Sequence, residues 1–439
     1  MALVKGTFSM LQIQDPELMQ LRFDHEQGNQ QARCPMKYLA QRPVLDLPFR
    51  SYFLLAVICS MLALGIWVSY LNGYFSLANN GISPLAWHIH EMLFGFAATV
   101  AVGFILTAAQ TWTGKASIKG LPLLAFILLW LMIRVCLLVN QPSTIILAVV
   151  LQSLWWLSSI IVFSRLVLAT KNRRNYLFIP LLLCLMSLNI TLLLVDFNGY
   201  GELTRHIART SVLMFCLLMG ILGGRIIPFF TVSGANLAAI KAPTWISSLL
   251  TAASILGILV FFSTAFIDLP FSPAGLMITA GLLHLIRQSY WRSMATINIP
   301  LLWSLHLAYF SLGLGLILLG MSYLPLNYLL PEYFKLSISF GDALHLITIA
   351  AMALMIFAMM SRVSLGHTGR ALKPSKLVSW LFYLIMLSAL ARTFLPVIQQ
   401  PVLAWNISAL AWIFASLLFL KVYLPILTVK KVEKSLHRQ

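Results

Sequence analysis

The chain has 439 residues, of which 60% are hydrophobic and only 10% are charged. Soluble domains carry about 25% charged residues, so this composition excludes an ordinary soluble protein. It predicts an integral membrane protein that crosses the bilayer many times. The formal net charge of +18 would suit a nucleic-acid-binding protein, but its distribution along the chain favours another explanation.

Apolar runs long enough to span a bilayer recur along the whole chain. We expect an all-α, polytopic bundle of twelve transmembrane helices, with loops too short to hold another domain. The expected spans are residues 50–71, 85–109, 121–139, 144–168, 176–196, 206–228, 244–267, 271–288, 300–322, 341–361, 377–396 and 402–427. Only the turn around Asp268-Leu269-Pro270 separates the seventh span from the eighth, and Pro228 is expected to end the sixth.

The basic residues indicate how the bundle is oriented. Most of the 30 lysines and arginines fall in the two tails and in alternate loops. By the positive-inside rule this bias places both termini in the cytoplasm. The basic charge then meets anionic membrane lipid, and we expect no nucleic-acid partner. Residues 1–49 are expected to form a partly disordered cytoplasmic tail, residues 50–428 the transmembrane domain and residues 429–439 a basic cytoplasmic tail.

Ionisable residues gather in the outer third of the expected bundle. The second, sixth and tenth spans begin at the outer face, and the third and eleventh end there. The set comprises His88, His90, Glu91, Arg134, His206, Arg209, Asp342, His345 and Arg392. Ionisable side chains in a bilayer are costly, and by default they indicate a functional site.

The four outer histidines are candidate metal ligands and candidate cofactor ligands. Neutral imidazole suits iron, copper and zinc, and two histidines from different helices can hold a haem iron. Buried arginines such as Arg134, Arg209 and Arg392 can meet the haem propionates. No C-x-x-C-H motif is present, so any haem would be bound non-covalently. Hydrogen bonding to a neighbouring helix stays open as the alternative role of each histidine.

Helical spacing predicts how these side chains are grouped. His88 and Glu91 are three residues apart and are expected to share a face, with His90 pointing roughly the other way. Asp342 precedes His345 by three residues and is expected to orient its imidazole, as Glu91 would for its neighbours. Glu91 could also serve as a proton relay, or as the structural partner of an arginine on another span.

A second polar set lies near the expected inner face. Its candidate members are Arg225, Arg362 and His367, and it also contains His284 and His306. His284 and His367 could simply face cytoplasmic water. We predict an inner-side site of undetermined role.

Several distinctive motifs follow one another along the chain. Residues 87–96 read WHIHEMLFGF and lead to Trp112-Thr113-Gly114, and they are followed by GGRIIPFFT at 223–231, DALH at 342–345 and SRVSLGHTGR at 361–370. In this order the motifs resemble those of the NnrS family, and the resemblance runs from about Pro43 to beyond Arg370. It implies a multi-pass protein of the bacterial inner membrane that binds haem and copper. It also implies a role in nitric oxide metabolism or in defence against nitrosative stress.

The resemblance also indicates which residues of this chain belong to the site. The histidine landmarks of the family correspond here to His88, His90, His345 and His367, with His206 beside them. We therefore expect a non-covalent, b-type haem, copper, and nitric oxide or a related small molecule as the partners of the site. The redox partner and the question of catalytic turnover stay open.

Two other functions remain alternatives. The first is a proton-coupled secondary transporter with a His/Glu relay, although no convincing repeat relates the two halves of the sequence. The second is a sensor or delivery factor that passes haem or copper onward without turnover. Histidines on the second, sixth and tenth spans also parallel the haem-copper oxidases, but the H-P-E-V-Y and adjacent His-His motifs of those enzymes are missing.

Overall fold

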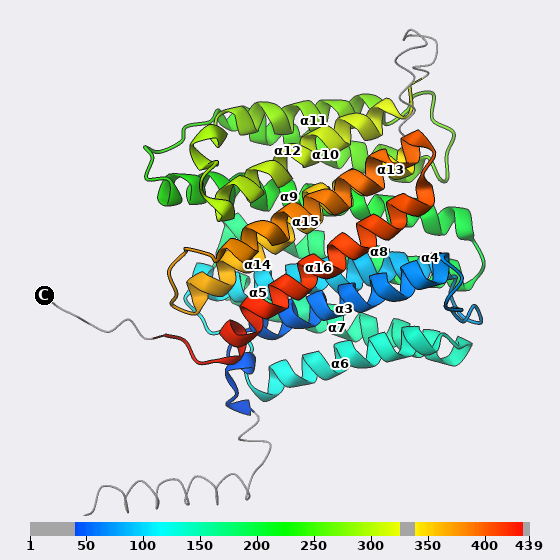
Figure 1. Cartoon of the computed structure of the whole chain (residues 1–439), viewed down its shortest axis with the longest axis horizontal. Helices are drawn as coiled ribbons and strands as arrows, with labels where there is room; N and C mark the ends of the chain where they lie inside the picture. Colours follow the sequence, from blue (N-terminus) through cyan, green and yellow to red (C-terminus); the bar gives the residue numbers. More distant parts are fainter. Residues whose placement is uncertain (1–39, 325–338, 433–439) are drawn as a thin grey trace, which may run out of the picture.

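The computed structural model describes residues 40–324 and 339–432, which form a bundle of long helices packed side by side (Figure 1). This part of the chain contains no β-strand. The all-α, polytopic architecture predicted from the sequence is therefore confirmed. Most of the expected N-terminal tail and of the C-terminal tail lies outside the described residues.

The bundle consists of twelve helical crossings in the described residues. Two of these crossings are built from three consecutive helical segments each. In chain order they are α3 (Pro48–Leu71), α4 (Pro84–His90) with η2 (Glu91–Ala97) and α5 (Ala98–Thr113), α6 (Leu121–Val139), α7 (Pro142–Ala169), α8 (Phe178–Phe197), α9 (Gly201–Gly234), α10 (Thr244–Ser263), α11 (Ala274–Ser289), α12 (Pro300–Met321), α13 (Phe340–His345) with η7 (Leu346–Ala353) and α14 (Leu354–His367), α15 (Lys376–Phe394), and α16 (Pro401–Thr428). Eleven of the crossings are long and apolar enough to span a membrane, and α11, with 16 residues, is the short one.

Short helical turns connect several of these elements. They are η1 (Pro43–Leu45), η3 (Arg173–Asn175), η4 (Ser293–Thr296) and η8 (Pro396–Ile398). Proline stands in the first turn of many spans, where its missing N–H would have no helical partner. At the second span, Ser83 caps the helix by accepting a hydrogen bond from the backbone N–H of Ala86 at 3.2 Å.

The sixth span is longer than the sequence predicted. Helix α9 continues to Gly234, and Pro228 lies inside it. The expectation that Pro228 ends this helix is therefore wrong. A proline removes one backbone hydrogen bond, but neighbouring helices in a membrane protein can make up for that loss, so the helix need not stop there.

The first and last spans meet at one face of the bundle. Arg50, near the start of α3, donates from Nη1 to the carbonyl oxygens of Leu427 at 3.1 Å and Val429 at 2.7 Å, at the end of α16. At the opposite face, Nδ2 of Asn72 donates to Oδ1 of Asn406 at 2.9 Å. The two described ends of the chain therefore lie on the same side, as an even number of crossings requires. We call this side the inner face; its cytoplasmic location stays a prediction from the basic residues.

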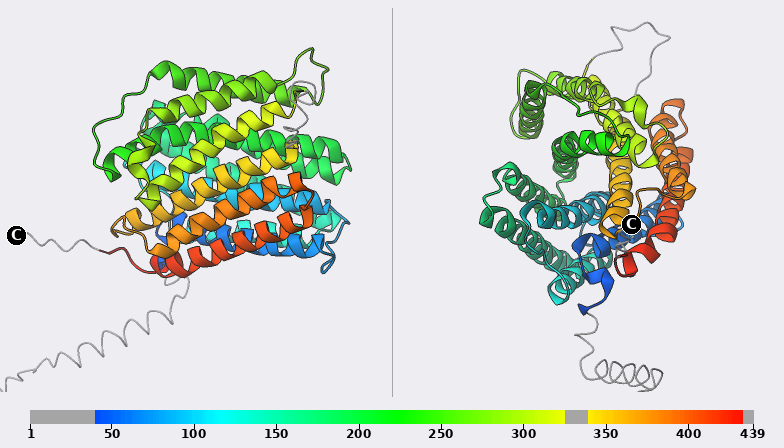
Figure 2. Two further views of the ribbon diagram at one scale, coloured as in Figure 1. Left: turned by 45° about the horizontal axis from the view of Figure 1, so that its top comes forward. Right: turned by 90° about the vertical axis from the view of Figure 1, so that its left-hand side faces the viewer.

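The second and tenth spans lie at the centre of the bundle. Pro84–Thr113 and Phe340–His367 are the most buried of the membrane-length helices. The view along the helices shows the other spans arranged around this core (Figure 2, right). Both central spans carry an internal π-helical stretch, which begins directly after His90 in one and after His345 in the other. π-Helical turns are rare in proteins, and those that occur often lie at functional sites.

Candidate functional site

A cavity of about 310 Å³ lies near the outer face, between six of the spans. Its walls come from α3, the second span, α9, the tenth span, α15 and α16. Most of its lining is apolar, with aromatic side chains from Trp67, Phe96, Trp405 and Trp412. This volume is at the lower end of the range typical of small-molecule and cofactor sites.

Two of the predicted histidines line this cavity: His88 from α4 and His345 from α13. The imidazole of His88 stacks on the indole of Trp67, with ring centroids 4.4 Å apart and an angle of 7° between the planes. Its Nδ1 is buried and has no hydrogen-bond partner. A buried polar atom without a partner is costly, so this nitrogen needs a proton acceptor or a ligand that the protein itself does not supply.

The orientation of His345 is set by the backbone of its own helix. Nδ1 of His345 lies 2.6 Å from the carbonyl oxygen of Gly341. Since a carbonyl only accepts, Nδ1 carries the proton in the neutral ring, and the lone pair of Nε2 is left available. A hydrogen bond of this kind fixes the tautomer of histidines that ligate metals.

Asp342 does not hydrogen-bond to His345, contrary to the sequence prediction. Its carboxylate accepts from Nη1 of Arg392 at 3.0 Å and from the hydroxyl of Ser339 at 2.6 Å. The carbonyl of Gly341 has taken the orienting role, because it lies one helical turn before the imidazole. Asp342 instead holds Arg392, which also lines the cavity.

Three arginines line the same cavity: Arg205, Arg209 and Arg392. The guanidinium of Arg209 lies over the ring of Phe340, 4.5 Å from its centroid. Arg205, which pairs with Glu202, was not among the predicted site residues. Its position four residues before Arg209, on the same face of α9, is the signal that would have identified it. An apolar cavity edged by cations suits an amphipathic anion.

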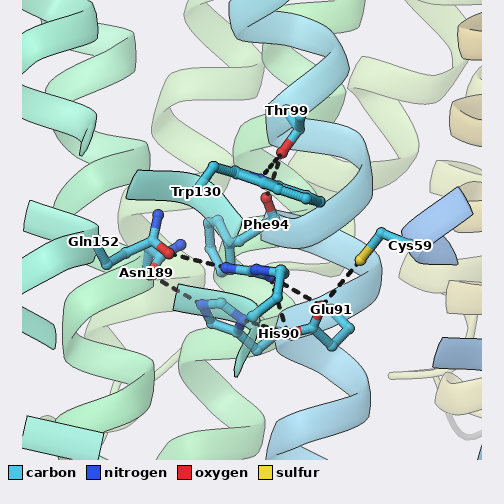
Figure 3. A network of polar contacts seen from close by, with 9 residues as sticks. Cys59, His90, Glu91, Phe94, Thr99, Trp130, Gln152 and Asn189 are labelled. Atoms are coloured by element: carbon cyan, nitrogen blue, oxygen red, sulfur yellow. Dashed lines mark hydrogen bonds and ion pairs between the residues drawn. The ribbon is translucent and has the colours of Figure 1, made fainter. Parts of the chain in front are cut away.

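His90 and Glu91 belong to a buried polar network (Figure 3), and neither of them lines the cavity. The carboxylate of Glu91 accepts from Nη1 of Arg134 at 2.9 and 3.0 Å and from Sγ of Cys59 at 3.1 Å. Nδ1 of His90 lies 3.6 Å from Oε1 of Glu91, and its Nε2 lies 3.3 Å from Oδ1 of Asn189. Of the roles left open for Glu91, pairing with an arginine of another span is the one observed.

His88 and Glu91 both face α3, as their three-residue spacing predicted, because His88 stacks on Trp67 and Glu91 accepts from Cys59. Their other contacts differ. Glu91 contacts His90 and residues of α3 and α6, whereas His88 lines the cavity. Arg134 is committed to Glu91 and to Oε1 of Gln152, 3.1 Å from its Nη2, and it does not line the cavity.

His206 also lies apart from the cavity lining. Its ring stacks on Phe261 of α10 at 4.4 Å, and its Nε2 lies 3.2 Å from the carbonyl oxygen of Phe262. His206 therefore has the structural role that the sequence left open for each histidine, namely a hydrogen bond to a neighbouring helix. Two of the four predicted histidines thus share one cavity and two do not.

The three residues of the predicted inner-side site have different neighbours. Arg225 donates to Oδ1 of Asn175 and to the carbonyl of Arg174, both at 3.2 Å. The guanidinium of Arg362 lies 4.0 Å from the centroid of Phe230, and the ring of His367 lies 5.6 Å from that of Phe49. The contacts found for these residues do not join them to one another.

His284, which was expected to be able to face water, is buried instead. It is 1% exposed, and its Nδ1 lies 2.7 Å from the hydroxyl oxygen of Tyr309. The helix that carries it, α11, packs closely on α12, so the ring is covered by protein. Within residues 40–324 and 339–432, no group of three or more His, Cys, Asp or Glu side chains is placed to hold a metal ion.

The comparison with protein families decides the relationship that the motifs suggested. A family model described as NnrS protein matches residues 43–431, nearly the whole chain. The chain belongs to the NnrS family. Membership supports, in general terms, a membrane protein with a role related to nitric oxide. No curated protein matches this NnrS-family chain.

Proposed function

We propose that this NnrS-family protein binds a b-type haem non-covalently in the cavity between its central spans. We place it in the bacterial inner membrane, with the cavity in the periplasmic third, and assign it to nitric oxide metabolism or to protection against nitrosative stress. The observation that carries the proposal is that His88 and His345, from the second and tenth spans, line one apolar cavity.

The donor set of the cavity fits haem. Imidazoles from separate helices are the usual axial ligands of b-type haem. Nδ1 of His88 is buried without a partner, and the lone pair of Nε2 of His345 is free of the backbone bond that fixes that ring. Arg205, Arg209 and Arg392 supply cations for two propionates, and the indoles of Trp405 and Trp412 add aromatic wall to the cavity. When bound, haem iron supplies the atom at which nitric oxide coordinates.

Residues around the cavity hold its histidines and one of its arginines in position. The stacking of Trp67 and the carbonyl of Gly341 hold the two imidazoles in place. Asp342 holds Arg392 at the rim through an ion pair. The apolar walls exclude water, which strengthens each of these polar interactions.

Copper was predicted with haem, and we propose it without assigning a site. Copper favours imidazole and thiolate ligands. The thiol of Cys59 donates its hydrogen bond to Glu91 in the network around His90. The described side chains offer no cluster of three ligands, so haem is the cofactor that the observed geometry supports better.

Nitric oxide titration of the haem-loaded protein tests the proposed function. The purified protein is loaded with haem b, reduced under anaerobic conditions and titrated with nitric oxide while its absorption spectrum is recorded. We expect saturable displacement of the Soret band in the wild type and in the His206→Ala control. We expect little displacement in His88→Ala/His345→Ala, because that variant retains little haem.

The same experiment separates turnover from sensing. Loss of dissolved nitric oxide, measured with an electrode, in the presence of a reductant would indicate an enzyme. Stoichiometric binding without further loss would indicate a sensor or carrier. A wild-type protein whose spectrum does not respond to nitric oxide contradicts the proposal in both forms.

A further inference from the structure

A second hollow lies far from the haem cavity, at the inner face. This groove of about 700 Å³ is formed by α11, the turn η4, α12 and α15. Its outer walls are apolar and open towards the surroundings of the bundle: Met294, Ile297, Phe310 and Tyr383 are all exposed. In a membrane this side faces the lipid, so a ligand can reach the groove from within the bilayer.

Gln288 supplies the first polar atom of the groove. The residue is only 7% exposed, and its Nε2 donates to the carbonyl oxygen of His306 at 2.8 Å. That bond fixes the amide orientation, since the opposite orientation would bring two acceptors together. Oε1 of Gln288 is buried and has no hydrogen-bond partner. It is an acceptor that lacks a donor.

Ser293 supplies the second polar atom, through a chain of hydrogen bonds. The hydroxyl of Thr231 donates to the carbonyl oxygen of Ile227 at 2.8 Å, so its oxygen must accept from Nε2 of His306, also 2.8 Å away. Nδ1 of neutral His306 is then an acceptor, and the hydroxyl of Ser293 donates to it at 2.8 Å. The lone pairs of the Ser293 oxygen are left for another donor.

The geometry points to a binding site for a membrane quinol, a ring with two hydroxyl groups and a long isoprenoid tail. Two acceptors, Oε1 of Gln288 and Oγ of Ser293, belong to residues that line the groove, and each can accept a hydrogen bond from one hydroxyl of the quinol. The indole of Trp303 and the ring of Tyr383 stack on each other at 5.3 Å and offer an aromatic wall. The apolar opening suits the tail.

Other membrane-soluble molecules match this groove less well. No lysine or arginine is among the residues that line it, so a phosphate headgroup finds no cation there. An oxidised quinone presents only acceptors, which do not satisfy the acceptors of Gln288 and Ser293. The groove should therefore distinguish the hydroxyl form of the ring from the carbonyl form.

A binding assay in nanodiscs tests this site. The full chain is embedded in zwitterionic phospholipid, and the binding of radiolabelled decylubiquinol and decylubiquinone is measured under anaerobic conditions. Since a hydrogen bond to a buried acceptor contributes about a tenfold effect on affinity and the quinol makes two, we expect quinol to bind up to about a hundredfold more tightly than quinone. Gln288→Met and Ser293→Ala should each lower this preference by about tenfold. Ser289→Ala is the matched control, because its hydroxyl already donates to the carbonyl of Ile286 at 2.8 Å.

Two outcomes of the assay would contradict the proposed quinol site. Equal affinity for the two forms, or a preference that survives both substitutions, would overturn it. Displacement of bound quinol by anionic phospholipid, with no dependence on Gln288 or Ser293, would show a lipid site instead. Thermal melting of each variant separates loss of the site from loss of the fold. The assay reads ligand binding alone, so its result is independent of whether haem binds in the outer cavity.

Discussion

Glu91 and Arg134 form a buried ion pair between the second and third spans, with Nη1 of the arginine 2.9 Å from Oε1 of the carboxylate. The side chain of Glu91 is 4% exposed and that of Arg134 is 12% exposed. Each charge has its counter-charge within the protein, so neither calls for an ionic ligand. Glu91 and Arg134 therefore belong to a structural network with His90, whereas His88 lines the cavity.

Removing one member of this pair should destabilise the protein strongly. An uncompensated buried charge costs about 3–5 kcal/mol, so Arg134→Met should lower the free energy of unfolding by about that amount. The double variant Glu91→Gln/Arg134→Met leaves no buried charge and should recover most of the loss. Unfolding in detergent, followed by circular dichroism, measures both. If the single and double variants were equally unstable, the ion pair would have no coupling energy.

The cavity arginines should control how tightly haem is held. Arg392→Gln and Arg209→Gln each remove a cation that can make a charge-assisted hydrogen bond, which contributes about 1.5–3 kcal/mol. We expect each to weaken haem binding by about tenfold or more in a haem titration of the apoprotein. Arg173→Gln, an exposed arginine near the inner face, is the control. Unchanged haem affinity in both cavity variants would show that propionates do not lie at this rim.

The contact between α11 and α12 should tolerate no side chain at Gly281. A Cβ at this position would lie 2.6 Å from the carbonyl oxygen of Gly313. Overpacking of this kind costs about 1–3 kcal/mol, so Gly281→Ala should lower the melting temperature. Gly275→Ala on the same helix is the matched control, because a Cβ added there would meet nothing within 4 Å. Equal stability of the two variants would mean that the helices do not approach as described.

Helix α11 should cross the membrane although it is the shortest of the twelve crossings. Its two ends are flanked by exposed residues, Phe271 before the helix and Met294 after it. In a cysteine-free background, Phe271→Cys should react with an impermeant maleimide added to the periplasmic side. Met294→Cys should react only after the inner membrane is opened. Labelling of both positions from one side would contradict the twelve-crossing topology and the orientation inferred from the basic residues.

The helices could be predicted from the sequence because the signal is local. Apolar runs identify each span, prolines mark the start of many of them, and the turn at Pro270 together with Pro273 marks the start of the short α11. The extent of α9 was not predictable in this way. Whether Pro228 ends a helix depends on the neighbouring helices that surround it, and the sequence does not show these neighbours directly.

The candidate site could be predicted in part. The predicted topology gave the depth of each histidine in the membrane, and it placed His88 and His345 at a similar depth. Depth does not determine the direction of a side chain. The π-helical turns after His90 and His345 have no recognisable residue pattern, so they were not predicted. Which partner a side chain meets depends on how neighbouring helices pack, so Asp342 pairs with Arg392 and not with His345.

Haem retention in single-histidine variants tests the central claim most directly. Wild-type protein, His88→Ala, His345→Ala and the controls His90→Ala and His206→Ala are purified with haem supplied during expression. The haem content per protein and the position of the Soret band are then measured. We predict that the wild type and the folded controls retain haem b, and that each cavity variant loses most of it or shows an altered Soret band. Full haem content with an unchanged spectrum in both cavity variants, or no haem in the wild type, would contradict the account.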